Sequence, residues 1–397
     1  MDHIFIANEY GLFCIYIGNK DDDLDNELNL DSNSGFDFSQ YTFDDYSGAH
    51  YKINLPSLIR SSGCGVSINS EHNLIAVGDL ERNITIFNSK WEDVEGCPHL
   101  KEEDLVMFRL QAKDAIRSVH WDEKLNKIFI GTMGGKIFEV DSNNSSIKQL
   151  ADLKQTVTCL RIYHIDENVP EKEKIILIMG TTGGNIFIYQ IVENDFIQIL
   201  NFIAHPPQPN NVDPRFGSLK YKAEIWSLTS LPTSKCSDNS FCLITSSEDQ
   251  CIRIWEFENK AFKNKPKLLH SFKNHDLAVT SVDWKPMKVL NGEILASCSD
   301  DKSIHIYDPL NNFELVKTLK TTDVLDWHTI TYLSLEENGT HLAVSTQNGF
   351  VVIFNLETWT PVFCEKLHLG GVEGLCWKKK LLVSCASDLN LGIIKFV

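Results

Sequence analysis

The chain lacks any uninterrupted run of about 18 apolar residues, the length that a membrane-spanning helix requires. It contains 11 cysteines but no Cys-x-x-Cys pair, so the usual spacing of a zinc or dithiol redox site is missing. The segment Met1-Asp-His also lacks the basic start of a secretory signal peptide. We therefore expect an intracellular protein with reduced thiols, located in the cytoplasm, the nucleus or both.

Basic residues are few: 37 Lys and Arg stand against 54 Asp and Glu, which gives a formal net charge of −17. The segment Asp21–Tyr46 alone contains nine acidic residues and no Lys or Arg. Because an acidic surface repels phosphate backbones, nucleic-acid binding is not expected. The most basic stretch is Lys260–Lys267, with four lysines and no acid, and we expect it to be a solvated surface loop.

Apolar stripes with the period of a helix are absent, and short hairpins recur instead. The run Ile244–Trp255 is answered by Leu295–Asp308, and in both a polar turn separates two alternating segments. Further copies lie at Ile75–Phe87, Ile128–Val140, Ile176–Tyr189, Leu342–Phe354 and Leu382–Phe396. Another short apolar run precedes each hairpin and a fourth often follows, at a period of about 40–60 residues. Four short strands per repeat predict the blade of a β-propeller.

The residues of one repeat follow the pattern of a known family. In order along the chain these are Asn274-His275, Val279–Pro286, Leu295-Ala-Ser, Asp301 and Ile304–Asp308. From residue 62 to 397 the chain resembles the WD40 repeat family, which implies an all-β, seven-bladed propeller. We expect residues 62–397 to form the propeller and residues 1–61 to supply a hairpin, an acidic insertion and a ring-closing strand. Residues 1–20 and 49–61 would belong to the same domain.

The C-terminus coincides with the end of a third strand, so the last blade lacks its outer strand. Propellers commonly supply that strand from the N-terminus, which removes a free sheet edge. Either Tyr51–Leu55 or the hairpin Ile4–Ile17 would do this. The main alternative to seven blades is an eighth, partial blade built on the hairpin.

In the WD40 family, a chain of hydrogen bonds ties each blade together. Its members are a His before the first strand, a Ser or Thr on the second strand, an Asp in the next turn and a Trp on the third strand. The resemblance assigns these roles to His275, Ser297, Asp301 and Tyr307. In the preceding blade His205 is separated from the first strand by a Pro-rich insertion, which leaves its part in the chain open. The other members there are Thr245, Asp249 and Trp255.

His275, Ser297 and Asp301 also have the composition of a hydrolase triad. The structural role explains them better, because each polar group finds a partner and avoids a penalty of about 1–3 kcal/mol for partial burial. No Gly-rich phosphate loop followed by a helix is present. Cys97 and His99 supply only two of the ligands that a zinc site needs. We expect no catalytic residue, cofactor or bound metal.

The start of each innermost strand and the residue before each turn Asp point to one rim, which commonly binds partners in proteins resembling this one. A Trp and an Arg on that rim are the residue types that dominate interface energies, and acidic neighbours favour a ligand carrying Lys or Arg. For Trp226 the alternative is packing between blades, and for Arg117 a solvated side chain. The rim would consist of Arg117, Glu224 and Trp226 from inner strands and Leu80, Met133, Thr182, Glu248, Asp300, Gln347 and Ser387 from turns.

Three insertions distinguish the chain from a minimal propeller: Asp21–Gly48, Trp91–Asp104 and Pro206–Lys222. Loops on a rigid scaffold often carry binding sites. The first insertion also holds five aromatic residues between Phe36 and Tyr46, which either dock on a partner or cover the propeller's own flank.

These observations predict a non-enzymatic interaction scaffold, a monomer within a heteromeric protein complex, whose rim binds an extended peptide with basic residues. Two alternatives remain: a hydrolase resembling the diphthamide-pathway esterase, and a substrate receptor of a ubiquitin ligase. The ligase-docking signature of the family ends in Trp-Asp-x-Arg. Its Arg is missing after both Trp255 and Tyr307, which disfavours the second alternative.

Overall fold

The computed structural model of the protein describes thirteen segments, and the N-terminal three are described by their backbone alone. The insertions Asp21–Gly48 and Trp91–Asp104, and the Pro-rich insertion after Pro206, lie outside the described residues, so the predictions made for them, and for Cys97 and His99, stay predictions. The segments are 2–8, 11–17, 49–53, 63–89, 106–165, 174–192, 195–206, 223–231, 240–260, 262–286, 292–320, 329–337 and 339–395.

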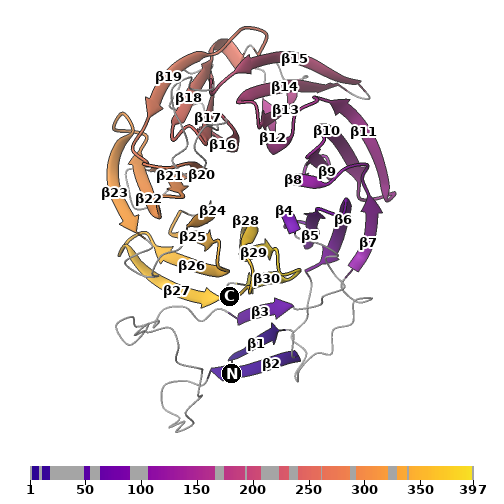
Figure 1. The fold of residues 1–397 in the computed structure, drawn as a ribbon, viewed down its shortest axis with the longest axis vertical. Coiled ribbons are helices and arrows are strands. Elements are labelled where there is room, and N and C mark those ends of the chain that lie inside the picture. Colours follow the sequence, from indigo (N-terminus) through magenta and orange to yellow (C-terminus); the bar gives the residue numbers. More distant parts are fainter. Residues whose placement is uncertain are drawn as a thin grey trace, which may run out of the picture.

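Seven sheets, or blades, form a ring around a central channel (Figure 1), and all of their strand pairs are antiparallel except one in the seventh sheet. Blade 1 consists of β4 (Gly63–Asn69), β5 (Leu74–Asp79), β6 (Asn83–Asn88) and β7 (Val106–Gln111). Blade 2 consists of β8 (Ile116–Asp122), β9 (Lys127–Thr132), β10 (Lys136–Asp141) and β11 (Ser146–Asp152). Blade 3 consists of β12 (Val157–Ile165), β13 (Lys174–Thr181), β14 (Asn185–Val192) and β15 (Asp195–Ile203).

Blade 4 consists of β16 (Ile225–Leu231), β17 (Phe241–Ser247), β18 (Ile252–Phe257) and β19 (Lys267–Phe272). Blade 5 consists of β20 (Val279–Pro286), β21 (Glu293–Ser299), β22 (Ser303–Asp308) and β23 (Glu314–Lys320). Blade 6 consists of β24 (Ile330–Leu335), β25 (His341–Thr346), β26 (Phe350–Asn355) and β27 (Thr360–Lys366). Helix in the described residues is limited to one 3₁₀ turn, η2 (Glu258–Lys260), in the lysine-rich connection between β18 and β19.

Blade 7 closes the ring and contains strands from both ends of the chain. It begins with β28 (Val372–Lys378), β29 (Leu381–Ala386) and β30 (Leu391–Lys395), and β3 (Ala49–Ile53) pairs antiparallel with β30. The hairpin of β1 (Asp2–Asn8) and β2 (Gly11–Ile17) extends the same sheet beyond β3. The seven-bladed ring is therefore confirmed. The alternative of an eighth blade was wrong, because the hairpin adds to the seventh sheet.

The hydrophobic core lies between neighbouring blades. Ile294 and Ile304 of blade 5, for example, pack in one cluster with Val344 and Val352 of blade 6, and all four are fully buried. The second and third strands of each blade are covered on both faces, so their side chains are buried without alternation, as in β21. Outer strands such as β23 expose most of their residues, because nothing described covers their outer face.

A turn residue with a positive φ recurs between the second and third strand of every blade. In blade 3 this residue is Gly184, with φ at 75°, and a Cβ built there would clash with the backbone carbonyl of His205. Glycine adopts a positive φ without strain, and at Gly184 the approach of the His205 carbonyl also leaves no room for a Cβ. The equivalent residues are Arg82, Gly135, Gln250, Lys302, Gly349 and Leu389.

The cysteine prediction holds in part. Six cysteines are free thiols: Cys159, Cys251, Cys298, Cys364, Cys376 and Cys385. Cys242, which is fully buried on β17, is disulfide-bonded, and its partner lies outside the described side chains. The expectation that every thiol is reduced was therefore wrong for Cys242, because a strand pattern does not reveal which distant cysteine approaches it.

Candidate functional site: the channel mouth and the blade networks

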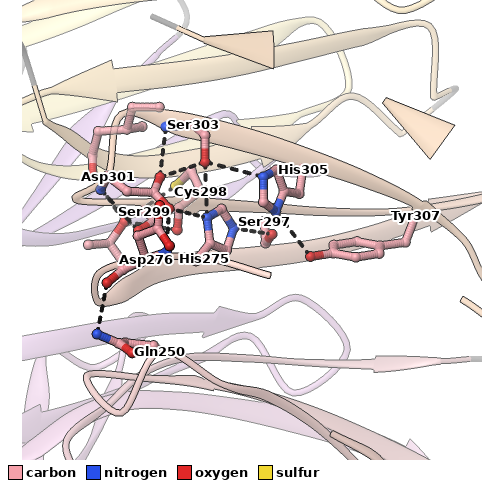
Figure 2. Close-up of polar contacts among 12 residues, drawn as sticks. Gln250, His275, Asp276, Ser297, Cys298, Ser299, Asp301, Ser303, His305 and Tyr307 are labelled. Atoms are coloured by element: carbon pink, nitrogen blue, oxygen red, sulfur yellow. Dashed lines mark hydrogen bonds and ion pairs between the residues drawn. The ribbon is translucent and has the colours of Figure 1, made fainter. Parts of the chain in front are cut away.

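A buried polar network ties the second turn of blade 5 to its strands (Figure 2). His275 Nδ1 lies 2.9 Å from Asp301 Oδ2, and His275 Nε2 lies 2.8 Å from the hydroxyl of Ser297. Asp301 also accepts the backbone N–H groups of Asp276 and Ser303, each at 2.9 Å. A carboxylate only accepts, so Nδ1 of His275 donates to Asp301 and the Ser297 hydroxyl donates to Nε2.

Two further side chains, those of His305 and Tyr307, lie beside this network (Figure 2). The His305 ring stacks on His275, with centroids 4.0 Å apart and planes at 10°. Burial and the charge of His275 lower the pKa of His305 to about 4. Tyr307 is fully buried, its hydroxyl lies 3.4 Å from His305 Nδ1, and burial, opposed by a hydrogen bond with Ser297, raises its pKa to about 12. Ser297 is itself fully buried, so its hydroxyl is closed to a substrate.

Blade 4 carries a second network, in which His205 takes part despite the insertion that follows it. Its Nδ1 lies 3.0 Å from Asp249 and its Nε2 lies 2.8 Å from Thr245 Oγ1, which accepts the indole N–H of Trp255 at 3.1 Å. Arg253 donates to Asp249 Oδ2 at 2.6 Å and stands where blade 5 has His305. Burial disfavours the ionised form of Asp249, but the hydrogen bond from His205 and the charges of His205 and Arg253 lower its pKa to about 2.

The sequence analysis missed a third network in blade 7. His368 Nδ1 lies 3.1 Å from Asp388, and His368 Nε2 lies 2.8 Å from the Ser384 hydroxyl. A usable signal was present, because the Ser or Thr precedes the Asp by four residues in all three networks. Ile394 stands at the position of Trp255, so this chain ends without an aromatic donor.

The predicted rim residues lie at one end of the channel, where each inner strand begins. The backbone N–H of Met133 donates to Ala115, that of Glu248 to Glu224 and that of Asp300 to Ala278, at 2.9, 2.9 and 3.1 Å. These bonds fix each turn beside the start of its inner strand. Leu80 and Met133 expose 37% and 47% of their surface, so the rim presents apolar side chains to solvent.

A β-bulge occurs near the start of every inner strand and turns its second residue toward the rim. In blades 3 and 5 this residue is a threonine that joins adjacent blades: Thr158 donates to the Ile225 carbonyl, and Thr280 to the Ile330 carbonyl at 2.9 Å. The larger residues at this position are Arg117, Trp226 and Glu373, from blades 2, 4 and 7.

These three residues meet across the channel. The guanidinium of Arg117 lies over the Trp226 ring, 5.5 Å from its centroid, and 3.6 Å from the Glu373 carboxylate. The indole N–H of Trp226 donates to Glu248 at 2.9 Å. We call Arg117, Trp226, Glu248 and Glu373 the mouth cluster. The prediction had not included Glu373, and Glu224 contributes its backbone carbonyl to the Glu248 turn.

The mouth cluster caps a channel of about 560 Å³ that inner strands of all seven blades line. Burial raises the pKa of Glu373, although Arg117 opposes the shift. No group of three or more His, Cys, Asp or Glu among the described side chains is arranged to hold a metal ion. In the described part of the chain, no helix is long and apolar enough to cross a membrane.

Comparison with known proteins agrees with this geometry. Residues 217–256 and 266–308 match the family profile described as "WD domain, G-beta repeat". Solved structures with the same fold include a chain of "Crystal Structure of Mitotic Checkpoint Complex" (TM-score 0.64, 17% identity, 96% of this chain and 98% of that one). Another is "Crystal structure of WD40 beta propeller domain of Doa1" (TM-score 0.60, 13% identity, 88% and 97%).

Sequence relatives align over shorter stretches. Protein hir1 of Aspergillus fumigatus is 28% identical over 38% of this chain and 16% of its own length. Nuclear distribution protein nudF 1 of Talaromyces marneffei is 29% identical over 34% and 27%, and nuclear distribution protein PAC1 of Arthroderma otae is 38% identical over 20% and 16%. The chain thus spans about a quarter or less of these relatives. Two segments of the chain therefore match the WD40 repeat profile, and the described chain as a whole has the fold of a seven-bladed β-propeller.

Proposed function

We propose that the protein is a non-enzymatic docking subunit of an intracellular protein complex and that its mouth cluster holds an extended peptide carrying Lys or Arg. The observation that carries this proposal is the meeting of Arg117, Trp226, Glu248 and Glu373 from three blades at one end of the channel. The cluster is already ordered by its own contacts, so a ligand loses little free energy in arranging it.

The chemistry of the mouth cluster favours a cationic side chain. Glu248 holds the Trp226 indole through one carboxylate oxygen, and the Glu373 side chain remains 36% exposed beside Arg117. A Lys or Arg from a partner gains charge-assisted hydrogen bonds to these carboxylates, and Trp226 offers a rigid surface for the peptide to pack on. The chain's net charge of −17 also attracts a basic partner over a longer range.

The relatives support a role in assemblies rather than in catalysis. The names Protein hir1 and nuclear distribution protein describe no enzymatic activity, and one structural neighbour is a chain of a multiprotein complex. The fully buried Ser297 hydroxyl gives no support to a hydrolase. We infer that the protein acts in the cytoplasm or the nucleus as one copy within a heteromeric complex.

The test begins with affinity purification of the tagged full chain, with mass spectrometry to identify its principal partner. We expect Trp226→Ala and Glu248→Lys each to reduce binding of that partner at least about tenfold, because truncating an interface anchor typically costs about 2 kcal/mol or more. Circular dichroism should remain unchanged.

Matched controls lie far from the channel. Leu315→Ala removes an exposed apolar side chain on β23, and Glu357→Lys makes the same charge change in an exposed turn of blade 6. Both should bind normally. If Trp226→Ala and Glu248→Lys also bind normally while a substitution within Pro206–Lys222 does not, the partner uses the insertion and the mouth-cluster proposal fails.

A further inference from the structure

The end of the channel opposite the mouth cluster is lined with cations. Arg117, Trp226 and Glu373 of the mouth cluster are the second residues of their inner strands, whereas Lys285 and Lys378 are the seventh residues of β20 and β28. Arg161, the fifth residue of β12, is exposed to the channel between the two ends. The turn after β28 adds Lys379 and Lys380, both exposed. The channel is therefore polarised within a strongly acidic protein.

Among the residues that the structure describes, neither Arg161 nor Lys285 has a carboxylate within ion-pair distance. The guanidinium of Arg161 donates to the carbonyl of its own neighbour Leu160 at 3.3 Å. The nearby acids are engaged elsewhere. Asp283 accepts the backbone N–H groups of Trp284 at 2.9 Å and Leu335 at 3.0 Å.

Lys378 is the cation that does form an ion pair at this end of the channel. Its Nζ lies 2.8 Å from Glu123, whose other oxygen also accepts the backbone N–H and the hydroxyl of Ser70, at 2.5 and 2.8 Å. Glu123 therefore neutralises Lys378, whereas Arg161 and Lys285 form no such ion pair with a described carboxylate. Glu337 is a further carboxylate of the channel lining, and it is exposed.

These cations come from separate blades, but their charges affect the same titratable groups beside the channel. Burial lowers the pKa of His120 well below its usual value, and the charges of Arg161, Lys378 and His164 lower it further. Burial raises the pKa of the Cys376 thiol, and Arg161, Lys378 and Lys285 all oppose that shift. The charges of these cations therefore reach groups of blades 2 and 7, in a channel whose lining also includes Asp283 and Glu337.

We propose that this end of the channel binds a compact anion bearing several phosphate groups, with Arg161, Lys285 and Lys378 as its charged contacts. The low-dielectric walls of a cleft strengthen the attraction between such cations and an anion. A channel of about 560 Å³ has the volume typical of a small-molecule site. Arg binds phosphate through a planar fork and Lys as a point charge.

The size of the ligand follows from the charge outside the channel. The protein carries a net charge of −17, so an extended nucleic acid would meet repulsion from the rest of the molecule, whereas a small polyphosphate can be enclosed. The three cations lie on three different inner strands, β12, β20 and β28, so a ligand with several phosphates offers each of them a separate charge.

Isothermal titration calorimetry of the full protein with inositol hexakisphosphate and with tripolyphosphate tests the proposal. The first ligand carries its phosphates on a ring and the second is linear, so the two titrations distinguish these two kinds of polyphosphate. We expect one-to-one binding of at least one of them, with a Kd below about 100 μM, and weaker binding of inorganic phosphate. Arg161→Gln and Lys285→Gln should each weaken binding about tenfold, because each loses a charge-assisted contact. Glu337→Gln should strengthen it.

The controls remove the same charge from outer strands: Lys267→Gln on β19 and Lys317→Gln on β23, both exposed. They should leave the Kd unchanged. The proposal is overturned if neither polyphosphate binds, if the outer-strand variants weaken binding as much as the channel variants, or if a uridine decamer binds as tightly as the polyphosphates. Retained circular dichroism of Arg161→Gln ensures that a loss of binding is not a loss of fold.

Discussion

Removing the aspartate of a blade network should have different consequences in blades 4 and 5. In both blades the carboxylate holds a buried histidine and the adjacent turn. In blade 4 it also compensates Arg253, which is 8% exposed and donates to Asp249 at 2.6 Å. In blade 5 the corresponding neighbour is His305, which is neutral at pH 7 because its pKa is lowered to about 4.

The expected loss in the free energy of unfolding depends on which groups lose their partner when each aspartate is replaced by alanine. Asp301→Ala leaves neutral donors without a partner, and we expect it to lower the free energy of unfolding by about 1–3 kcal/mol. Asp249→Ala leaves a buried guanidinium without a counter-ion, which typically costs about 3–5 kcal/mol. Replacing Arg253 by Met in the Asp249→Ala background removes that charge and should restore about 2 kcal/mol.

Urea unfolding at pH 7, followed by tryptophan fluorescence, measures all the variants on one scale. The single variant Arg253→Met completes the double-mutant cycle with Asp249. Equal losses for Asp249→Ala and Asp301→Ala, or strictly additive effects of the Asp249 and Arg253 changes, would refute the argument from the buried charge. If Asp249→Ala does not fold, recovery of folded protein by the added Arg253→Met change becomes the readout.

Two further outcomes test the turns and the buried carboxylates. Gly184→Ala should lower the urea midpoint more than Gly292→Ala. Both glycines have a positive φ, but an added Cβ meets the His205 carbonyl at Gly184 and nothing within 4 Å at Gly292. Equal shifts of the two midpoints would contradict the clash at Gly184. The pKa of Asp249 is lowered to about 2 in the folded state, so its ionised form stabilises the fold by about 2 kcal/mol above pH 4, and this contribution is lost as the pH falls through 2. The difference in unfolding free energy between the wild type and Asp249→Asn should therefore shrink from pH 4 to pH 2, and a constant difference would contradict the assigned pKa.

The repeat architecture could be predicted from the sequence because a blade is a local object. Each hairpin consists of strands joined by a short turn, so its alternation and turn residues appear within about 15 residues of one another. The blade 5 network was predictable for the same reason: Ser297 and Asp301 are four residues apart on one strand and its turn, and His275 immediately precedes that blade.

The tertiary structure decided which distant residues meet. His205 reaches Asp249 because the chain returns, after a 16-residue insertion, to the next blade beside β15. Arg117 and Glu373 are separated by most of the sequence, and their side chains meet because ring closure places β28 of blade 7 beside β4 of blade 1, which in turn lies beside β8, the strand of Arg117. The polarity of the channel has the same origin. The sequence determines each blade through short-range alternation, whereas the central surface is formed by one strand from each of seven blades, and its chemistry exists only once the ring has closed.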